Sequence, residues 1–152
     1  MQHSTNKHAA TELQLYIDND GDLYRRQTSS ILKNLATKKA RGQYKHDLAV
    51  KTFGYLVEAG AKKYAKEARE HSAGRFDPPW HKMFGTATRK RVATELTSDF
   101  EGGYALGNYD QLLPRKYQAA LKAARSRCLK RFTTNALVPG TKPKTGGLTN
   151  AT

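Results

Sequence analysis

The residues of this sequence that are best suited to chemistry are cations near its C-terminal end. Residues 113–152 contain nine Lys and Arg and no Asp or Glu, in a chain whose net charge is +14. Positive side chains that no neighbouring carboxylate neutralises are typical of sites for phosphate groups or for acidic protein surfaces. The nine are Arg115, Lys116, Lys122, Arg125, Arg127, Lys130, Arg131, Lys142 and Lys144.

The first seven of these cations lie in residues 115–132, for which the sequence predicts one basic amphipathic helix. Pro114 suits the first turn of such a helix. The apolar residues recur with a helical period and form one stripe, while the seven cations take the rest of the circumference. The stripe consists of Tyr117, Leu121, Ala124, Cys128 and Phe132. We therefore predict that the seven cations make phosphate contacts.

Three interpretations of this helix compete. A run of charge is more often a solvated helix face, but acids normally alternate with bases on such faces. Since no acid does so here, we favour an anionic partner. A membrane surface is a weaker interpretation, because only Leu121 and Phe132 on the stripe are suited to insertion.

Two smaller basic clusters lie elsewhere in the chain. Lys38, Lys39 and Arg41 precede Gly42, so they are explained equally well as cations in the last turn of a helix. The second cluster, Arg89, Lys90 and Arg91, lies where a helix is expected to start, and cations are electrostatically unfavourable there. We add these three to the candidate nucleic-acid-binding residues.

No pattern in the sequence supports catalysis, a metal or a cofactor. Asp18, Asp20 and Asp22 imitate the first three ligands of a calcium loop, but Leu23 stands where that loop needs Gly and Ser29 where it needs Glu. We therefore expect an ordinary turn. The single cysteine excludes an internal disulfide, and burial is its favoured role. The prediction is a non-enzymatic protein without cofactor.

The choice of apolar residues predicts an all-α fold. Leu and Ala dominate, whereas Ile and Val together number six, and straight-chain or small residues favour helix over strand. A chain of 152 residues is typical of one domain. We expect a single-domain bundle of four to five helices over residues 11–132, with disordered tails at residues 1–10 and 133–152.

Local signals place the helices that must carry the candidate residues. One is expected to run from Leu23 to a stop at Gly42, and the next to begin at an Asp47 N-cap. The latter has one apolar face, formed by Ala49, Phe53, Leu56, Val57, Gly60 and Tyr64. After the loop at residues 75–80, Thr86 or Thr88 is expected to cap the start of a further helix. It ends either at Gly102-Gly103 or, if it runs on, with Gly107 as its cap.

Residues 13–110 resemble small helical proteins of bacteriophages and prophages. The likeness rests on Asn19–Tyr24, on Lys33-Asn34-Leu35 with Lys38-Lys39 and Gly42, on residues 55–64 (Tyr-Leu-Val-Glu-Ala-Gly-Ala-Lys-Lys-Tyr), on the cluster at 80–84 and on Leu-Gly-Asn-Tyr at 106–109. The resemblance implies a phage origin and a helical body. It implies no activity and transfers no site residue, and the basic helix lies outside it.

These observations predict a phage accessory protein that binds the phosphate backbone of DNA or RNA with little sequence specificity. The alternative is a phage modulator that docks on an acidic surface of a host or phage protein, and a virion or assembly component is a weaker one. No membrane span or signal peptide is visible, so we expect a soluble protein in the cytoplasm of a bacterial host. Oligomeric state is left open.

Overall fold

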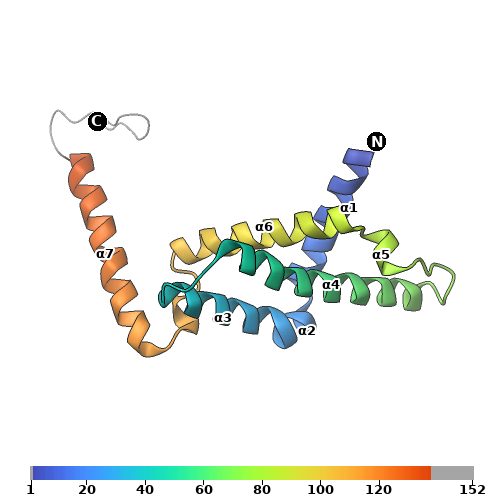
Figure 1. Cartoon of the computed structure of the whole chain (residues 1–152), viewed down its shortest axis with the longest axis horizontal. Helices are drawn as coiled ribbons and strands as arrows, with labels where there is room; N and C mark the ends of the chain where they lie inside the picture. Colours follow the sequence, from blue (N-terminus) through green and yellow to red (C-terminus); the bar gives the residue numbers. More distant parts are fainter. Residues whose placement is uncertain (1, 138–152) are drawn as a thin grey trace. The chain divides into compact units, whose positions relative to one another are not determined.

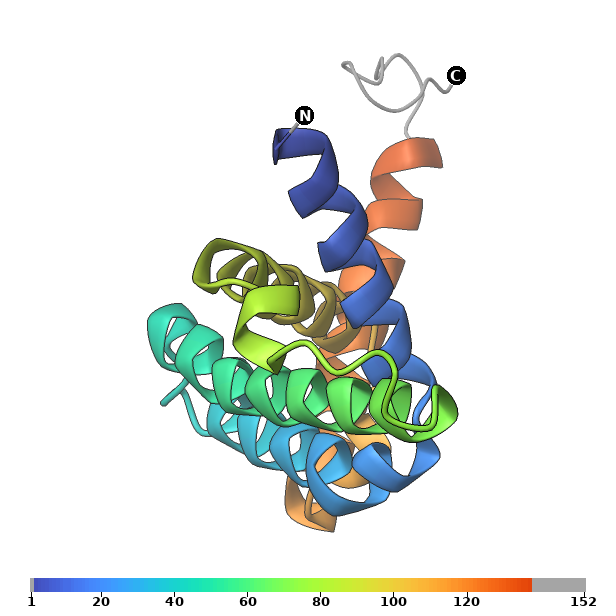
Figure 2. The ribbon, with the colours of Figure 1, turned by 90° about the vertical axis from the view of Figure 1, so that its right-hand side faces the viewer.

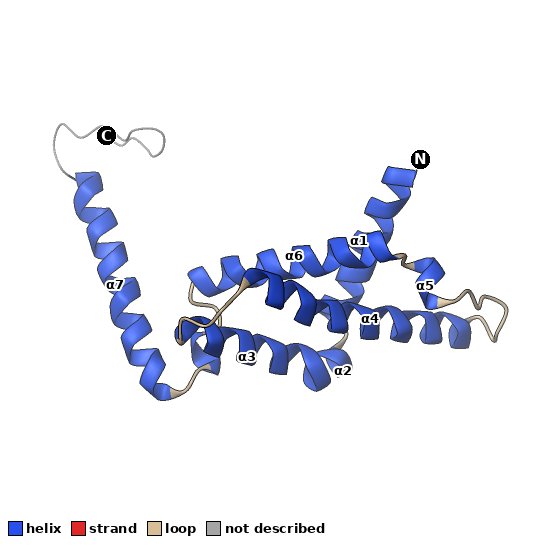
Figure 3. Ribbon diagram, viewed as in Figure 1, coloured by secondary structure: helices blue, strands red, loops and turns tan. Residues whose placement is uncertain are grey.

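The computed structural model describes the backbone of residues 2–137 and the side chains of residues 7–127 (Figure 1). In that part of the chain every regular element is helical and no strand occurs, so the predicted all-α class is confirmed (Figure 3). The helices are α1 (Gln2–Asn19), α2 (Gly21–Leu23), a π-helical turn (Tyr24–Thr28), α3 (Ser29–Ala40), α4 (His46–His71), α5 (Trp80–Met83), α6 (Thr86–Ala105), a 3-10 turn (Asp110–Leu112) and α7 (Arg115–Leu137).

The chain divides into two compact units, Met1–Leu112 and Leu113–Thr152. The first contains α1 to the 3-10 turn, and the second contains α7. The division falls between Leu112 and Leu113, just before Pro114, and the residue that precedes a proline is disfavoured in a helix. The single helical domain expected over residues 11–132 is thus shared between two units.

The core of the first unit lies among three helices. α4 and α6 run side by side in opposite directions, and α1 crosses both of them (Figures 1 and 2). Leu13 and Ile17 of α1, Phe53 of α4 and Phe100 of α6 are at most 2% exposed. The apolar face predicted for α4 is confirmed from Ala49 to Gly60, where five of its members are buried.

Helix stops agree with the sequence where glycine sets them. Gly42 has φ +72°, its amide donates to the Lys39 carbonyl, and the Gln43 amide donates to the Lys38 carbonyl at 2.8 Å. This is the Schellman pattern expected at Gly42. Gly107 ends α6 in the same way, with φ +85°, so the second of the two alternatives for that helix is correct.

Gly102-Gly103 does not end α6, because Gly103 has a packing role. A Cβ at Gly103 would lie 2.8 Å from the ring of Tyr109, which stacks on Phe100 at a centroid distance of 5.2 Å. Glycine here lets an aromatic ring lie against the helix backbone, and the burial gained outweighs the roughly 1 kcal/mol of lost helix propensity.

The predicted helix starts were misplaced by one or two residues. α4 begins at His46 with Lys45 at its N-cap, so Asp47 lies in the first turn rather than at the cap. α6 begins at Thr86 with Gly85 at its N-cap, and no side chain caps it. Asp47 is still favourable, since a carboxylate in the first turn complements the positive end of the helix dipole.

Both predicted tails are shorter in the structure than the sequence suggested. Residues 2–10 continue α1, because no Gly or Pro interrupts the chain before Gly21. At the other end α7 includes residues 133–137, since Thr and Asn only weaken a helix and the first breaker is Pro139. The remainder of the predicted tail, residues 138–152, lies outside the described residues.

Candidate nucleic-acid interface

The cationic surface of the second unit is built on α7. Pro114 precedes the helix, and its carbonyl accepts the Tyr117 amide at 2.9 Å, which closes the first turn. The side-chain amide of Gln118 donates to the Leu113 carbonyl at 2.7 Å and ties down the entry to the helix. Arg115 and Lys116 then lie in the first turn, where the helix dipole disfavours cations and no acid accompanies them. Local stability therefore does not explain the charges at this helix end.

The exposures along α7 follow the predicted stripe. Tyr117, Leu121 and Ala124 are partly buried, whereas four of the predicted cations are exposed. These four are Arg115, Lys116, Lys122 and Arg127. At 100° per residue, the seven predicted cations spread over an arc of about 240°. The four exposed cations occupy about 140° of that arc.

The remaining predicted cations of α7 differ from these four. Arg125 is partly buried and engaged in an interaction of its own. Lys130 and Arg131 belong to the described backbone of α7, but their side chains lie outside the described residues, as do those of Cys128 and Phe132. The described interface therefore rests on the four exposed cations.

The second predicted cluster, at the start of α6, does not act as one group. The Arg89 Nε donates to the Phe84 carbonyl at 3.0 Å, and its guanidinium lies 4.9 Å from the centroid of the Trp80 ring. Arg89 therefore anchors α5 to α6, with Lys62 of α4 against the same ring at 5.2 Å. Lys90 and Arg91 are exposed and make no such contact among the described residues. Within this cluster, Lys90 and Arg91 therefore remain the candidates for binding an anion.

In the basic cluster before Gly42, Lys39 makes its contacts within the first unit. Lys39 Nζ lies 4.8 Å from the ring centroid of Tyr44 and 5.5 Å from that of Tyr104. The hydroxyl of Tyr44 donates to Glu101 Oε2 at 2.6 Å, and His46 Nδ1 lies 2.7 Å from the same oxygen. Hydrogen bonds from Tyr44 and His46 lower the pKa of Glu101, and Glu101 in turn raises the pKa of His46. This arrangement fixes the start of α4 to the last turns of α6.

The acidic turn after α1 is an ion-paired helix cap. Asp20 Oδ1 accepts the Leu23 amide at 2.8 Å, and both carboxylate oxygens of Asp20 accept from Lys63 Nζ at 2.7 Å. The hydrogen bond from Lys63 is the main cause of a lowered pKa at Asp20. Among the described residues no group of acids, histidines and cysteines is arranged to hold a metal ion.

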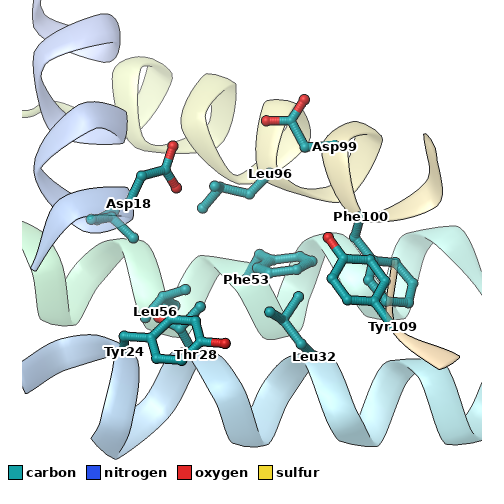
Figure 4. Close-up of a pocket in the computed structure, with 11 residues that line it drawn as sticks. Asp18, Tyr24, Thr28, Leu32, Phe53, Leu56, Leu96, Asp99, Phe100 and Tyr109 are labelled. Carbon is teal, nitrogen blue, oxygen red and sulfur yellow. The ribbon is translucent and has the colours of Figure 1, made fainter. Parts of the chain in front are cut away.

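A small cavity in the first unit brings two carboxylates together above an apolar floor (Figure 4). Its volume is about 160 Å³, and Asp18 of α1 and Asp99 of α6 lie at its edge above Phe53 and Leu96. Burial and the charge of Asp99 raise the pKa of Asp18. Asp18 also lies in the last turn of α1, where the helix dipole disfavours an anion.

We expect the substitution Asp18→Asn to stabilise the protein at neutral pH. A carboxyl group whose pKa is raised by folding stabilises the folded state when protonated, and this contribution is lost as the pH rises through the raised pKa. The variant should therefore unfold at a higher urea concentration than wild type at pH 7. The gain should shrink as the pH is lowered toward 4. A gain that is equal at every pH would contradict an electrostatic origin.

Sequence reasoning missed a basic region on α4. Lys51 is exposed and Tyr55 is 65% exposed, and both line a groove that also contains Lys90 of α6. The available signal was that Tyr55 lies off the apolar face predicted for this helix. Lys51 and Lys90 are 39 positions apart in the sequence, so only the packing of α4 on α6 brings them together.

Comparison with protein-family models, with curated proteins and with solved structures finds no match to this chain. No helix in the described part of the chain is long and apolar enough to cross a membrane. Fold and surface together define a small all-α protein with a strongly basic terminal helix.

Proposed function

We propose that this protein is a non-enzymatic nucleic-acid-binding accessory protein of phage origin, which holds the phosphate backbone through α7. The observation that carries the proposal is the exposure of Arg115, Lys116, Lys122 and Arg127 on a helix within a segment that contains no acid. Neutralisation of phosphates by such cations releases counterions and drives binding to any sequence. The phage origin is supported by the resemblance of residues 13–110 to phage proteins.

Weak sequence preference is part of the proposal. Bases are read mainly by amide and guanidinium groups that form paired hydrogen bonds to base edges. Between residues 115 and 132 the one amide side chain is Gln118, and it already donates to the Leu113 carbonyl. Contacts from α7 are therefore expected to go to phosphates, which position a protein without specifying sequence.

The test is a titration of the full chain against a short DNA duplex at several salt concentrations. If about four side chains reach phosphates, log affinity should fall against log salt with a slope near −3.6. Scrambling the duplex sequence should change the affinity little. Absence of binding at low salt would overturn the proposal.

The alternative partner, an acidic surface of a host or phage protein, is distinguished by a pull-down from bacterial lysate with and without nuclease. Partners that vanish on nuclease treatment support the proposed function. A specific protein that stays bound after nuclease treatment, in the absence of duplex binding, would assign α7 to protein docking instead. Co-purification with phage particles would point to a virion component.

A further inference from the structure

The first unit has its own basic groove, formed where α4 and α6 pack side by side. The groove has a volume of about 360 Å³. Lys51, Gly54 and Tyr55 line it from α4, and Arg89, Lys90 and Ala93 line it from α6. All of these residues belong to the unit Met1–Leu112, so the groove does not involve α7.

The charge of the groove suits an anion. Lys51 and Lys90 are exposed, and neither has a carboxylate within ion-pair distance among the described residues. Glu58 also lines the groove, but it pairs with Lys62 at 3.0 Å on the same helix. That ion pair cancels its charge locally, which leaves the cations of the groove without an internal counterion. Phosphate groups would provide one.

Gly54 has no packing explanation in the part of the chain that the structure describes. Glycine inside a helix costs roughly 0.5–1 kcal/mol relative to alanine. At Gly60 of the same helix that cost is explained, because a Cβ would lie 2.6 Å from Ile17 Cγ1. A Cβ at Gly54 would meet no atom within 4 Å, yet the residue lines the groove. Close approach of a ligand to the backbone is another role that glycine serves.

Tyr55 favours unpaired bases as the ligand. Its side chain is 65% exposed, and it stands one turn along α4 from Lys51. An exposed aromatic ring beside cations offers a face on which a base stacks while the adjacent phosphate meets a lysine. Bases in a duplex already stack on one another, so this surface suits a single strand.

From these observations we infer that the groove between α4 and α6 binds single-stranded nucleic acid. Lys51 and Lys90 contact its phosphates, Tyr55 stacks on a base, and Gly54 lets the strand approach the helix backbone. An acidic peptide would pair with the lysines, but it carries no base that would stack on the exposed ring of Tyr55. The site goes beyond the proposed function, because it involves a different unit and a different form of nucleic acid.

The experiment measures the anisotropy of a fluorescent oligothymidylate and of a fluorescent duplex with the full-length chain. Gly54→Leu fills the groove without changing any charge, and Tyr55→Ala removes the stacking surface. We expect each to weaken binding of the single strand about tenfold, in line with the loss of one base stack. Binding of the duplex through α7 should stay within about twofold of wild type, since these variants leave the phosphate contacts of α7 in place.

Matched controls separate groove effects from general ones. Gly102→Leu alters another helical glycine whose Cβ would meet no atom within 4 Å, and Phe76→Ala removes an aromatic side chain that is 52% exposed. Neither residue lines the groove. Both variants should bind the single strand like wild type, and circular dichroism should show that all four variants remain helical.

Several outcomes would overturn the inference. Wild-type binding of the single strand by both Gly54→Leu and Tyr55→Ala would do so, even if α7 binds duplex as proposed. An equal loss of affinity for oligoglutamate would assign the groove to an acidic peptide. A dimer that Gly54→Leu dissociates would assign it to a second copy of this chain. By contrast, loss of duplex binding with retained binding of the single strand, when the cations of α7 are neutralised, would support a separate site in the groove.

Discussion

A variant in which the four exposed cations of α7 are replaced by glutamine is expected to bind duplex DNA about a thousandfold more weakly than wild type at roughly 0.1 M salt. The substitutions are Arg115→Gln, Lys116→Gln, Lys122→Gln and Arg127→Gln. About four phosphate contacts imply a slope near −3.6, so their electrostatic contribution at this salt concentration amounts to more than three powers of ten. The expected loss is therefore about a thousandfold.

Two readouts of this variant are informative together. The salt slope should become shallower by about 0.9 for each phosphate contact that is removed. A variant with a misfolded helix would not show this proportion between the slope and the number of substitutions. Glutamine has nearly the helix propensity of lysine and arginine, so the far-ultraviolet circular dichroism should not change. The measurement is the same salt titration that tests the wild-type chain.

The control for this variant changes the same amount of charge on the first unit. Four exposed cations of that unit that lie outside the groove are replaced by glutamine, namely Lys33, Lys45, Lys66 and Arg69. If net charge alone attracted the duplex, this variant would lose as much affinity as the α7 variant. A loss of less than about tenfold is expected, because these four residues are not among the proposed phosphate contacts, and counterion release at such contacts drives the binding.

Local signals were enough to predict some elements of this fold. Gly42 and the cations before it predict the end of α3 because the Schellman geometry is contained within a few residues. The apolar face of α4 follows from the helical period, which is also local. Such features depend on no residue that is distant in the sequence.

Other features depend on contacts between distant residues, and the sequence did not reveal them. Gly103 continues a helix because Tyr109 packs on it after a turn, and a glycine pair by itself indicates a helix end. Arg89 looked like a surface cation, but the Phe84 carbonyl and the Trp80 ring hold it. The groove was missed for the same reason, since α4 and α6 come from separate parts of the chain.

The same dependence on distant contacts makes Gly60 the most sensitive glycine of α4. The substitution Gly60→Ala should destabilise the protein by about 2 kcal/mol, because overpacking a dense core costs about 1–3 kcal/mol and outweighs the gain in helix propensity. The new Cβ would lie 2.6 Å from Cγ1 and 3.0 Å from Cδ1 of Ile17. Ile17 is 1% exposed, so its side chain has little room to move away. Urea unfolding followed by circular dichroism measures the change.

The matched control, Gly54→Ala in the same helix, should change stability in the opposite direction. Its Cβ meets no atom within 4 Å, so the gain of roughly 0.5–1 kcal/mol in helix propensity is expected without an opposing clash. A second test combines Gly60→Ala with Ile17→Ala, which removes the clashing atoms. In that background Gly60→Ala should be neutral or stabilising, and the difference between the two backgrounds measures the coupling of α1 to α4. If both glycine substitutions stabilise the protein to the same degree, α1 does not pack against α4 at Gly60 in solution.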